Sequence, residues 1–181
     1  MENKVSGRNL SVSYKTKRLL AQTLLLALAT AFELLSKSSP ELKEEIDDWE
    51  DGRVFALGVM PDGPAVTMKK EDGRIKFLGK GLKENPQLVI YFKNLDSALL
   101  PLTGQMGAHI AFAQHRAILH GNVGEAMQIN RAMAIVQKYL LPAMVLKKTS
   151  KRPPKYTLSQ TMLKARVMAV LGVGLALNAL K

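Results

Sequence analysis

The strongest hydrophobic pattern in the chain is a helical repeat near its N-terminus. Apolar residues recur there at steps of three and four, the spacing of one face of an α-helix, at Leu20, Leu24, Ala27, Leu28, Ala31 and Leu35. The pattern is interrupted at residues 36–40, where Ser39 and Pro40 suit the cap and the first position of a second helix. That shorter helix is expected to present one apolar edge, made of Leu42, Ile46 and Trp49.

At Arg53 the apolar pattern changes to a period of two, which is typical of β-strands. Three strands are predicted over residues 53–60, 65–70 and 74–79, and a fourth over 87–93. Sequences containing Asp-Gly separate the first three, so these strands are expected to form an antiparallel meander.

The chain returns to helical spacing after the fourth strand. Asn94 is expected to cap a short helix that Thr103-Gly104 ends. A second short helix is expected over residues 106–114, followed by a brief strand at 117–119.

A long helix is expected to open at Gly121-Asn122 and to close at Pro142. Its apolar stripe consists of Ala126, Ile129, Met133, Val136 and Leu140. A basic linker over residues 147–155 then leads to a final helix over 158–180. The length of 181 residues allows one domain of ordinary size with extensions.

The net charge of +11 is concentrated in the two ends of the chain. Residues 1–18 carry five basic side chains against one acidic, residues 143–181 carry eight against none, and the stretch between them carries 13 against 14. Nucleic-acid-binding domains usually have a basic face on the folded body, so this distribution argues against that class. It favours an anionic membrane surface or an acidic partner, although charged runs are often simply solvated.

Two apolar runs in the sequence are candidates for membrane-spanning helices. Polar residues interrupt the run over 19–35, and the run over 167–177 is much shorter than the roughly 20 residues that a spanning helix needs. We therefore expect neither run to cross a bilayer. Residues 1–31 also resemble an export signal, since Ala29-Thr30-Ala31 has the form of a cleavage site, but the helical pattern continues past it and favours a retained helix.

The sequence offers little to support catalysis. It contains no cysteine, and His109, His115 and His120 follow one another at separations of six and five residues, neither of which places two imidazoles on one helical face as an i,i+4 zinc pair requires. The glycines at 73–81 lack the spacing and the Ser or Thr of a phosphate-binding loop. We therefore expect no enzymatic activity, no cofactor and no metal.

Nine methionines give the chain a flexible apolar component. Methionine adapts to ligands of varied shape, so a methionine-rich interior suits an apolar cavity. Ordinary core packing explains the same residues, and composition alone leaves the two interpretations open.

Residues 86–140 resemble the second half of a sterol carrier protein type 2 domain. In that family a strand leads to a helix ending in Leu-Thr-Gly, followed by an apolar helix, a short strand, a glycine and a long helix. The corresponding segments here are Val89-Ile90-Tyr91-Phe92, Leu102-Thr103-Gly104, Ile110-Ala111-Phe112-Ala113 and Ile118-Leu119-His120-Gly121. The first half, from Leu19, matches by order of elements only.

The resemblance implies an α+β fold. We expect an antiparallel sheet of about five strands, helices packed on one side enclosing an apolar tunnel, and an additional C-terminal helix. The expected organisation is a basic arm over residues 1–18, a lipid-binding domain over 19–142, and a basic linker with an apolar helix over 143–181.

The function implied is non-catalytic binding and carriage of apolar lipids such as acyl chains, sterol-like or isoprenoid molecules. The residues expected to bind the ligand are Phe77, Ile90, Phe92, Leu99, Leu102, Ile110, Phe112, Met127 and Met133. The alternative is an accessory or scaffold protein that presents lipid substrates to a membrane-associated enzyme complex. We further expect a cytoplasmic homodimer, peripheral to an anionic membrane through its basic ends, that binds no nucleic acid.

Overall fold

The computed structural model describes residues 7–141 and 156–179, and the side chains of residues 13–141 and 156–172. Its elements are, in chain order, α1 (Gly7–Ser38), α2 (Pro40–Asp47), β1 (Val54–Val59), β2 (Ala65–Glu71), β3 (Arg74–Lys80), β4 (Leu88–Phe92), α3 (Leu95–Leu102), α4 (Ala108–Ala113), β5 (Ala117–His120), α5 (Val123–Leu140) and α7 (Leu158–Ala179). The predicted linker at residues 147–155 lies outside the described residues.

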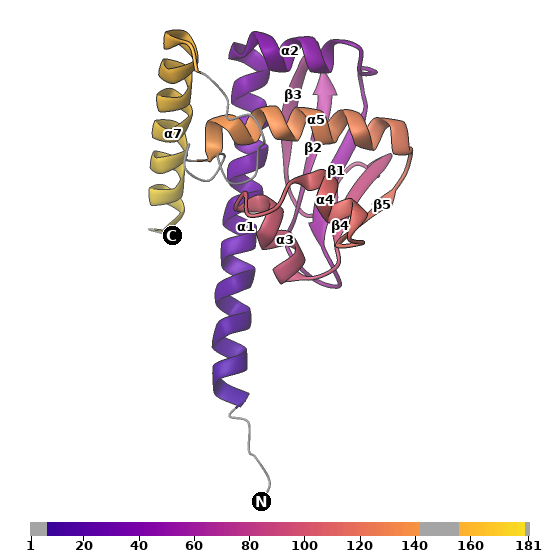
Figure 1. Ribbon diagram of the computed structural model, residues 1–181, viewed down its shortest axis with the longest axis vertical. Helices are drawn as coiled ribbons and strands as arrows, with labels where there is room; N and C mark the ends of the chain where they lie inside the picture. The colour runs from indigo at the N-terminus through magenta and orange to yellow at the C-terminus, as the bar shows by residue number, and fades with distance from the viewer. Residues whose placement is uncertain (1–6, 142–155, 180–181) are drawn as a thin grey trace, which may run out of the picture.

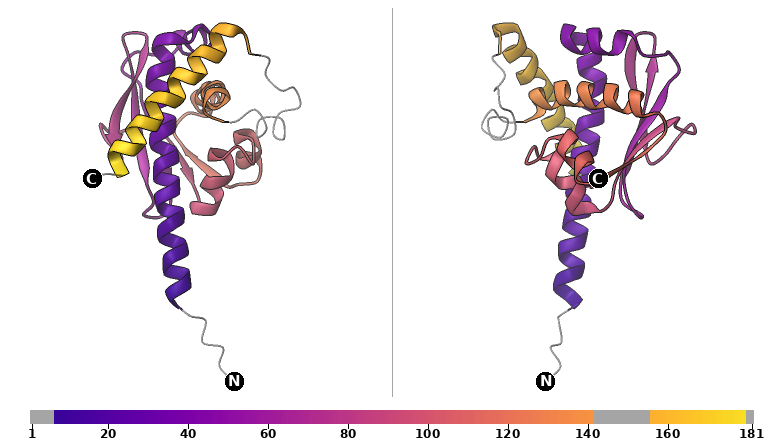
Figure 2. Two further views of the ribbon diagram at one scale, coloured as in Figure 1. Left: turned by 90° about the vertical axis from the view of Figure 1, so that its left-hand side faces the viewer. Right: turned by 45° about the vertical axis from the view of Figure 1, so that its right-hand side comes forward.

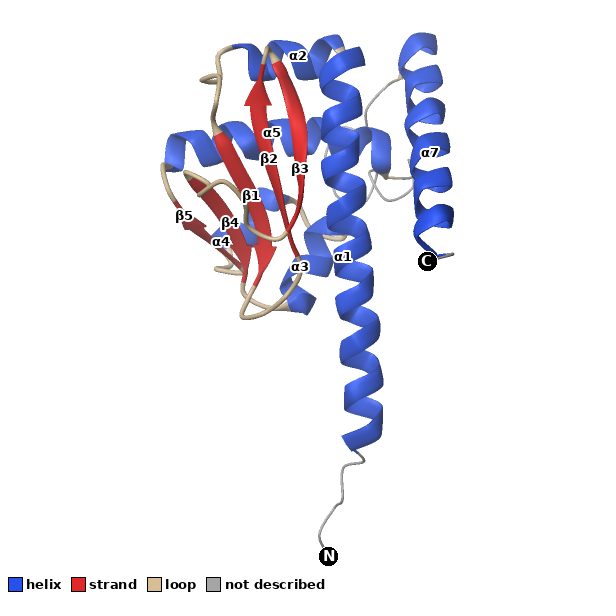
Figure 3. Ribbon diagram, turned by 180° about the vertical axis from the view of Figure 1, so that it is seen from behind, coloured by secondary structure: helices blue, strands red, loops and turns tan. Residues whose placement is uncertain are grey.

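The five strands form one sheet in the order β3-β2-β1-β4-β5 (Figure 1). Helices cover one face of this sheet, and Figure 3 shows the other face in front of them. Alternate residues of the central strand, Phe55, Leu57 and Val59, belong to the hydrophobic core on the helical side. The α+β architecture predicted from the sequence is confirmed.

One pair of strands departs from the predicted antiparallel sheet. β1 and β4 run parallel, with Phe55 opposite Leu88, whereas the other three pairs are antiparallel. The reason is the connection from β3 to β4, which must pass β2 and β1 to reach its place in the sheet. Two hydrogen bonds hold this connection against the sheet. The Thr67 hydroxyl donates to the Gly81 carbonyl at 2.7 Å, and the Val54 amide donates to the Gln87 side chain at 2.6 Å.

Helix α1 is longer than the sequence pattern indicates. It starts at Gly7, and its N-terminal part extends away from the rest of the described chain (Figure 2). Its C-terminal part is a core helix, since Leu25, Ala29 and Phe32 are fully buried and Phe32 meets Phe55 edge-on at 6.2 Å between ring centroids.

The prediction that the N-terminal apolar run is unsuited to crossing a bilayer needs correction in one respect. By length and composition alone, Ser13–Ser38 is long and apolar enough to cross a membrane. A large part of that segment is buried against the sheet and the other helices. Cleavage after Ala31 would remove residues that fill the core, so the fold favours a retained helix.

Ion pairs and caps fix α5 across the sheet. The Asn122 side chain accepts hydrogen bonds from the Gly124 and Glu125 amides and so caps its start. Arg131 pairs with Glu45 of α2 at 2.9 Å, and Lys138 pairs with Glu41 of the same helix. Helices α2 and α5 are therefore held together along their exposed sides.

Helix α7 packs as an outer layer on α1 and α5 (Figures 1 and 2). Val167 and Leu171 are its buried residues among those whose side chains are described. In the structure this apolar C-terminal helix therefore packs against its own domain.

Candidate functional site

An apolar cavity of about 260 Å³ lies where α1, α3, α5 and α7 meet. We call it the α7 cavity. Its lining residues are Leu24, Ala27, Leu28, Leu102, Gln137, Leu140, Leu141, Met168, Leu171 and Gly172. Aliphatic side chains dominate this set, and Gln137 is its one polar side chain.

Each helix contributes to the cavity through its local pattern. Leu24, Ala27 and Leu28 lie at steps of three and four on α1, so they share the face that meets α7. The amide nitrogen of Gln137 donates to the Pro101 carbonyl of α3 at 3.1 Å. Since this donor is engaged within the protein, a ligand in the cavity meets a wall that offers mainly apolar contacts.

Polar contacts hold α7 over the cavity. The Lys164 ammonium donates to the carbonyls of Lys138 at 3.0 Å and Leu141 at 2.6 Å, which are at the C-terminal end of α5. The Tyr156 hydroxyl donates to the same Lys138 carbonyl at 2.7 Å. Burial lowers the pKa of Lys164 and raises that of Tyr156, since desolvation disfavours the charged form of each.

Gly172, an exposed residue of α7, lies at the edge of the cavity. A Cβ atom built at this position meets no heavy atom within 4 Å. A larger side chain could therefore stand there without clashing at its first atom, which makes this position useful for experiments.

The nine ligand-binding residues predicted from the sequence are distributed over three environments. Leu102 lines the α7 cavity. Ile90, Phe92 and Met133 are buried in the core, and Phe77, Leu99 and Phe112 pack partly buried against it. Ile110 and Met127 are 39% and 40% exposed. Of the nine predicted residues, one thus lines the α7 cavity. For the other eight, a role in ligand binding stays a prediction.

Sequence reasoning missed most of the cavity wall. Leu24 and Leu28 were recognised as a helical face but not as part of a binding site, and Met168 and Leu171 were placed on a helix without a known dock. A signal was present, because the residues after Arg166 are too apolar to face water on all sides. Which part of the domain this apolar segment covers depends on tertiary packing.

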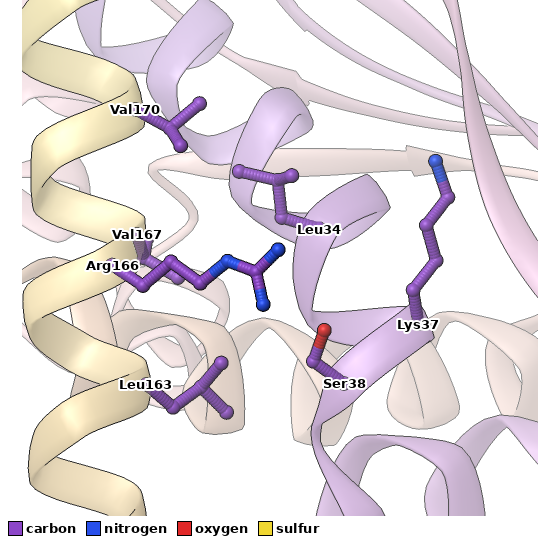
Figure 4. Close-up of a pocket in the computed structure, with 7 residues that line it drawn as sticks. All are labelled: Leu34, Lys37, Ser38, Leu163, Arg166, Val167 and Val170. Carbon is purple, nitrogen blue, oxygen red and sulfur yellow. The ribbon is translucent and has the colours of Figure 1, made fainter.

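A second, smaller depression lies between the end of α1 and α7 (Figure 4). This cleft has a volume of about 150 Å³ and is lined by Leu34, Lys37, Ser38, Leu163, Arg166, Val167 and Val170. Lys37 is paired with Glu33 at 2.9 Å. Lys37 and Arg166 give this cleft positive charge. Its volume is smaller than that of the α7 cavity.

The described residues contain no group of three or more His, Asp or Glu side chains arranged to hold a metal ion. His109, His115 and His120 are all exposed.

Comparison with known proteins gives similarity in fold. No protein-family model matches the chain, and no curated protein matches it. A crystal structure of sterol carrier protein 2 is 17% identical, with a TM-score of 0.47, and the match covers 64% of this chain and 95% of that one.

Two further solved structures show similarity of the same order. UbiJ-SCP2, described as a ubiquinone synthesis protein, is 14% identical with a TM-score of 0.45, over 61% of this chain and 96% of that one. The apo form of sterol carrier protein 2 from Yarrowia lipolytica is 16% identical with a TM-score of 0.44, over 61% and 88%. All three are structures of sterol carrier protein 2 or of an SCP2 protein.

Proposed function

We propose that this protein binds and carries apolar lipid-type molecules without transforming them. The observation that carries the proposal is the α7 cavity, an aliphatic space of about 260 Å³ beneath a helix of the same chain. Ligand pockets usually occupy roughly 300–1,000 Å³. The cavity therefore suits one alkyl or isoprenoid chain better than a bulky ring system.

Apolar contact alone supplies useful affinity for such a ligand. Burial of a methylene contributes about 0.8 kcal/mol, so about eight methylenes contribute about 6 kcal/mol. This free energy corresponds to a dissociation constant of tens of micromolar, on the order expected for a carrier that must also release its cargo.

The position of α7 supports reversible loading. Among its described side chains, Val167 and Leu171 are buried, and Lys164 and the preceding Tyr156 make polar contacts with the end of α5. Separation of α7 from α1 and α5 would open the cavity along its length. We propose that α7 moves to admit and release the ligand.

We also propose that the basic ends bring the protein to an anionic membrane. In the described part of α1, Lys15 and Arg18 are exposed beside Leu19, which is 66% exposed. Each basic residue near an anionic surface contributes about 1 kcal/mol, and apolar side chains add to the attraction. A carrier located at this surface could exchange ligand with the bilayer.

A substitution at Gly172 tests the carrier function. Gly172→Phe should fill the cavity and abolish binding of diphenylhexatriene, a fluorescent hydrocarbon, while the fold is retained. Gly172→Ala is the matched control, since it adds one methyl group and improves helix propensity by about 1 kcal/mol. Ala169→Phe, on the exposed side of α7, controls for added apolar surface. Equal binding by Gly172→Phe and the wild type would refute the assignment of this cavity.

The accessory role is the second candidate, and the extended part of α1 favours it (Figure 2). A helix that leaves the domain with Tyr14, Leu19 and Leu20 exposed offers a surface to a membrane-associated enzyme complex as well as to lipid. Co-purification of a defined enzyme that depends on Leu19 and Leu20, with no transfer of lipid between vesicles, would favour this role over carriage.

A further inference from the structure

Asn130, in the middle of α5, has a buried amide group without hydrogen-bond partners. Within the residues whose side chains are described, buried side-chain nitrogen or oxygen atoms without a partner occur in Trp49 and Asn130, and in Asn130 both amide atoms are affected. The residue is 9% exposed. Most buried polar atoms in proteins are paired, so an amide with neither atom paired suggests a missing partner.

The direction of this amide follows from its place on the helix. Asn130 precedes Gln137 by seven residues, and positions seven apart lie on nearly the same face of an α-helix. Gln137 reaches the Pro101 carbonyl of α3 and lines the α7 cavity. Asn130 therefore lies on the face of α5 that is directed toward α3 and α4, which lie beneath α5 in Figure 1.

The α7 cavity and Asn130 are close enough for one ligand. Seven residues span about 10 Å along the helix axis. Met133 lies between them on the same face and is buried. Its flexible side chain can move aside for a chain that enters from the cavity. An alkyl chain of moderate length would reach from the cavity to the amide.

We propose that Asn130 binds the hydroxyl group of a neutral lipid whose chain occupies the α7 cavity. The proposal rests on the proposed carrier function and names its ligand class, an uncharged lipid alcohol. An amide offers one acceptor oxygen and a donor nitrogen, which match a hydroxyl that donates once and accepts once.

The other common class, the fatty-acid anion, matches a buried amide less well. Burial of a carboxylate requires a cation, and Lys70 is the buried charged residue in the described part of the chain. Its ammonium is occupied by the carbonyls of Ile46 and Trp49, at 2.8 and 3.0 Å, at the end of α2. An uncharged amide does not offset the charge of a buried carboxylate, so it favours a neutral head group.

The test compares dodecanol, dodecane and dodecanoate as competitors of bound diphenylhexatriene, with the full-length wild type and Asn130→Leu. Leucine has the same branched arrangement of side-chain heavy atoms but cannot form hydrogen bonds. The affinity for dodecanol should fall about tenfold in this variant, since a bonded hydroxyl loses its partner, whereas the affinity for dodecane should not fall. Dodecanoate should bind the wild type more weakly than dodecanol.

Stability without ligand gives a second readout. Replacing an unpaired buried amide by leucine should raise the thermal midpoint of the empty protein, whereas a midpoint that falls would indicate that Asn130 has a structural partner such as a bound water. Asn130→Ala serves if the leucine variant does not fold, and it should show the same selective loss of dodecanol.

The possible failures can be told apart. Equal losses for dodecanol and dodecane, or no loss for either, would overturn the role of Asn130 and leave the carrier function standing. If the wild type binds neither dodecane nor dodecanol, the carrier function itself fails, and the role of Asn130 fails with it.

Discussion

The ammonium group of Lys164 in α7 donates a hydrogen bond of 2.6 Å to the carbonyl oxygen of Leu141, at the end of α5. The last carbonyls of a helix lack partners within the helix, and a cation there also interacts favourably with the helix dipole. Leu141 itself lines the α7 cavity. The contact that satisfies the end of α5 therefore also positions the helix that covers the cavity.

Removal of this contact should loosen α7. Lys164→Met keeps most of the aliphatic chain and deletes the hydrogen bonds to Lys138 and Leu141. Because the group is partly exposed, we expect a loss of about 1–2 kcal/mol in the docking of α7. Amide hydrogen exchange in α7 should accelerate by roughly tenfold, while exchange in β1 stays unchanged. Lys93→Met, at an exposed position, is the control; similar exchange in both variants would contradict the prediction.

The same lysine predicts a dependence on pH. Burial lowers the pKa of Lys164 below its usual value of 10.5, so between the lowered and the usual value the unfolded chain binds more protons than the folded one. Stability contributed by this residue should therefore rise with pH in that window, since the neutral amine still donates hydrogen bonds.

Measurement of thermal midpoints for the wild type and Lys164→Met from neutral pH to 10.5 isolates this effect. The difference between the two proteins cancels the titration of other groups, including Tyr156 to the extent that its surroundings are unchanged. The advantage of the wild type should grow as the pH rises. A difference that is constant or shrinks would refute the assignment.

The core position of α1 predicts a large effect from one aromatic residue. Phe32 is fully buried and packs edge-on against Phe55. Phe32→Ala should destabilise the protein by about 3–5 kcal/mol, through lost burial and a new cavity. Leu19→Ala, at an exposed position of the same helix, should change stability by less than about 0.5 kcal/mol. The free energy of unfolding of both variants can be measured by chemical denaturation. If Phe32→Ala lowers it as little as Leu19→Ala, α1 is not part of the core.

Local chemistry explains which parts of the fold the sequence predicted well. Ser39 accepts a hydrogen bond from the Leu42 amide and Asn94 from the Ser97 amide, so both expected caps are confirmed. The long helix starts where it was predicted, and the Asn122 side chain caps it by accepting from the Gly124 amide. A cap depends on residues two or three positions away, and therefore on information that a short stretch of sequence contains.

Long-range features were not accessible in the same way. The parallel pairing of β1 with β4 depends on where a connection crosses the sheet, and nothing in either strand specifies its neighbour. The extension of α1 to Gly7 was missed because residues 7–18 are polar and lack an apolar repeat. The helix there continues from the apolar segment that is buried in the domain.

The candidate site shows the same limit. The apolar faces predicted on α1 and α5 are buried, but only packing decides whether such faces fill space or enclose it. Leu102 was the one predicted ligand residue that lines the cavity. The unpaired amide of Asn130 is equally invisible in the sequence, since a buried asparagine becomes unusual only when its surroundings offer no partner.

Membrane binding should depend on the exposed basic residues of α1. Lys15→Gln with Arg18→Gln removes two charges, and at about 1 kcal/mol each the affinity for anionic vesicles should fall by roughly thirtyfold. Binding of the wild type should weaken as salt increases. Lys80→Gln with Lys93→Gln, also exposed, is the matched control. Equal sedimentation with neutral and anionic vesicles would exclude this mode of binding.

The outer face of α7 bears on the predicted homodimer. The structure packs α7 on its own domain and leaves Met162 66% exposed. A dimer formed through this helix would use that face, because the opposite side covers the cavity. Met162→Glu should therefore convert a dimer to a monomer, since burial of a carboxylate in an apolar interface is unfavourable. Glu substitution of Thr161, its exposed neighbour in α7, tests how sharply the interface is defined. Analytical ultracentrifugation of each protein measures the mass directly. If the wild type sediments as a monomer at all concentrations, no dimer forms through α7. The role of this helix is then to cover the cavity of its own chain.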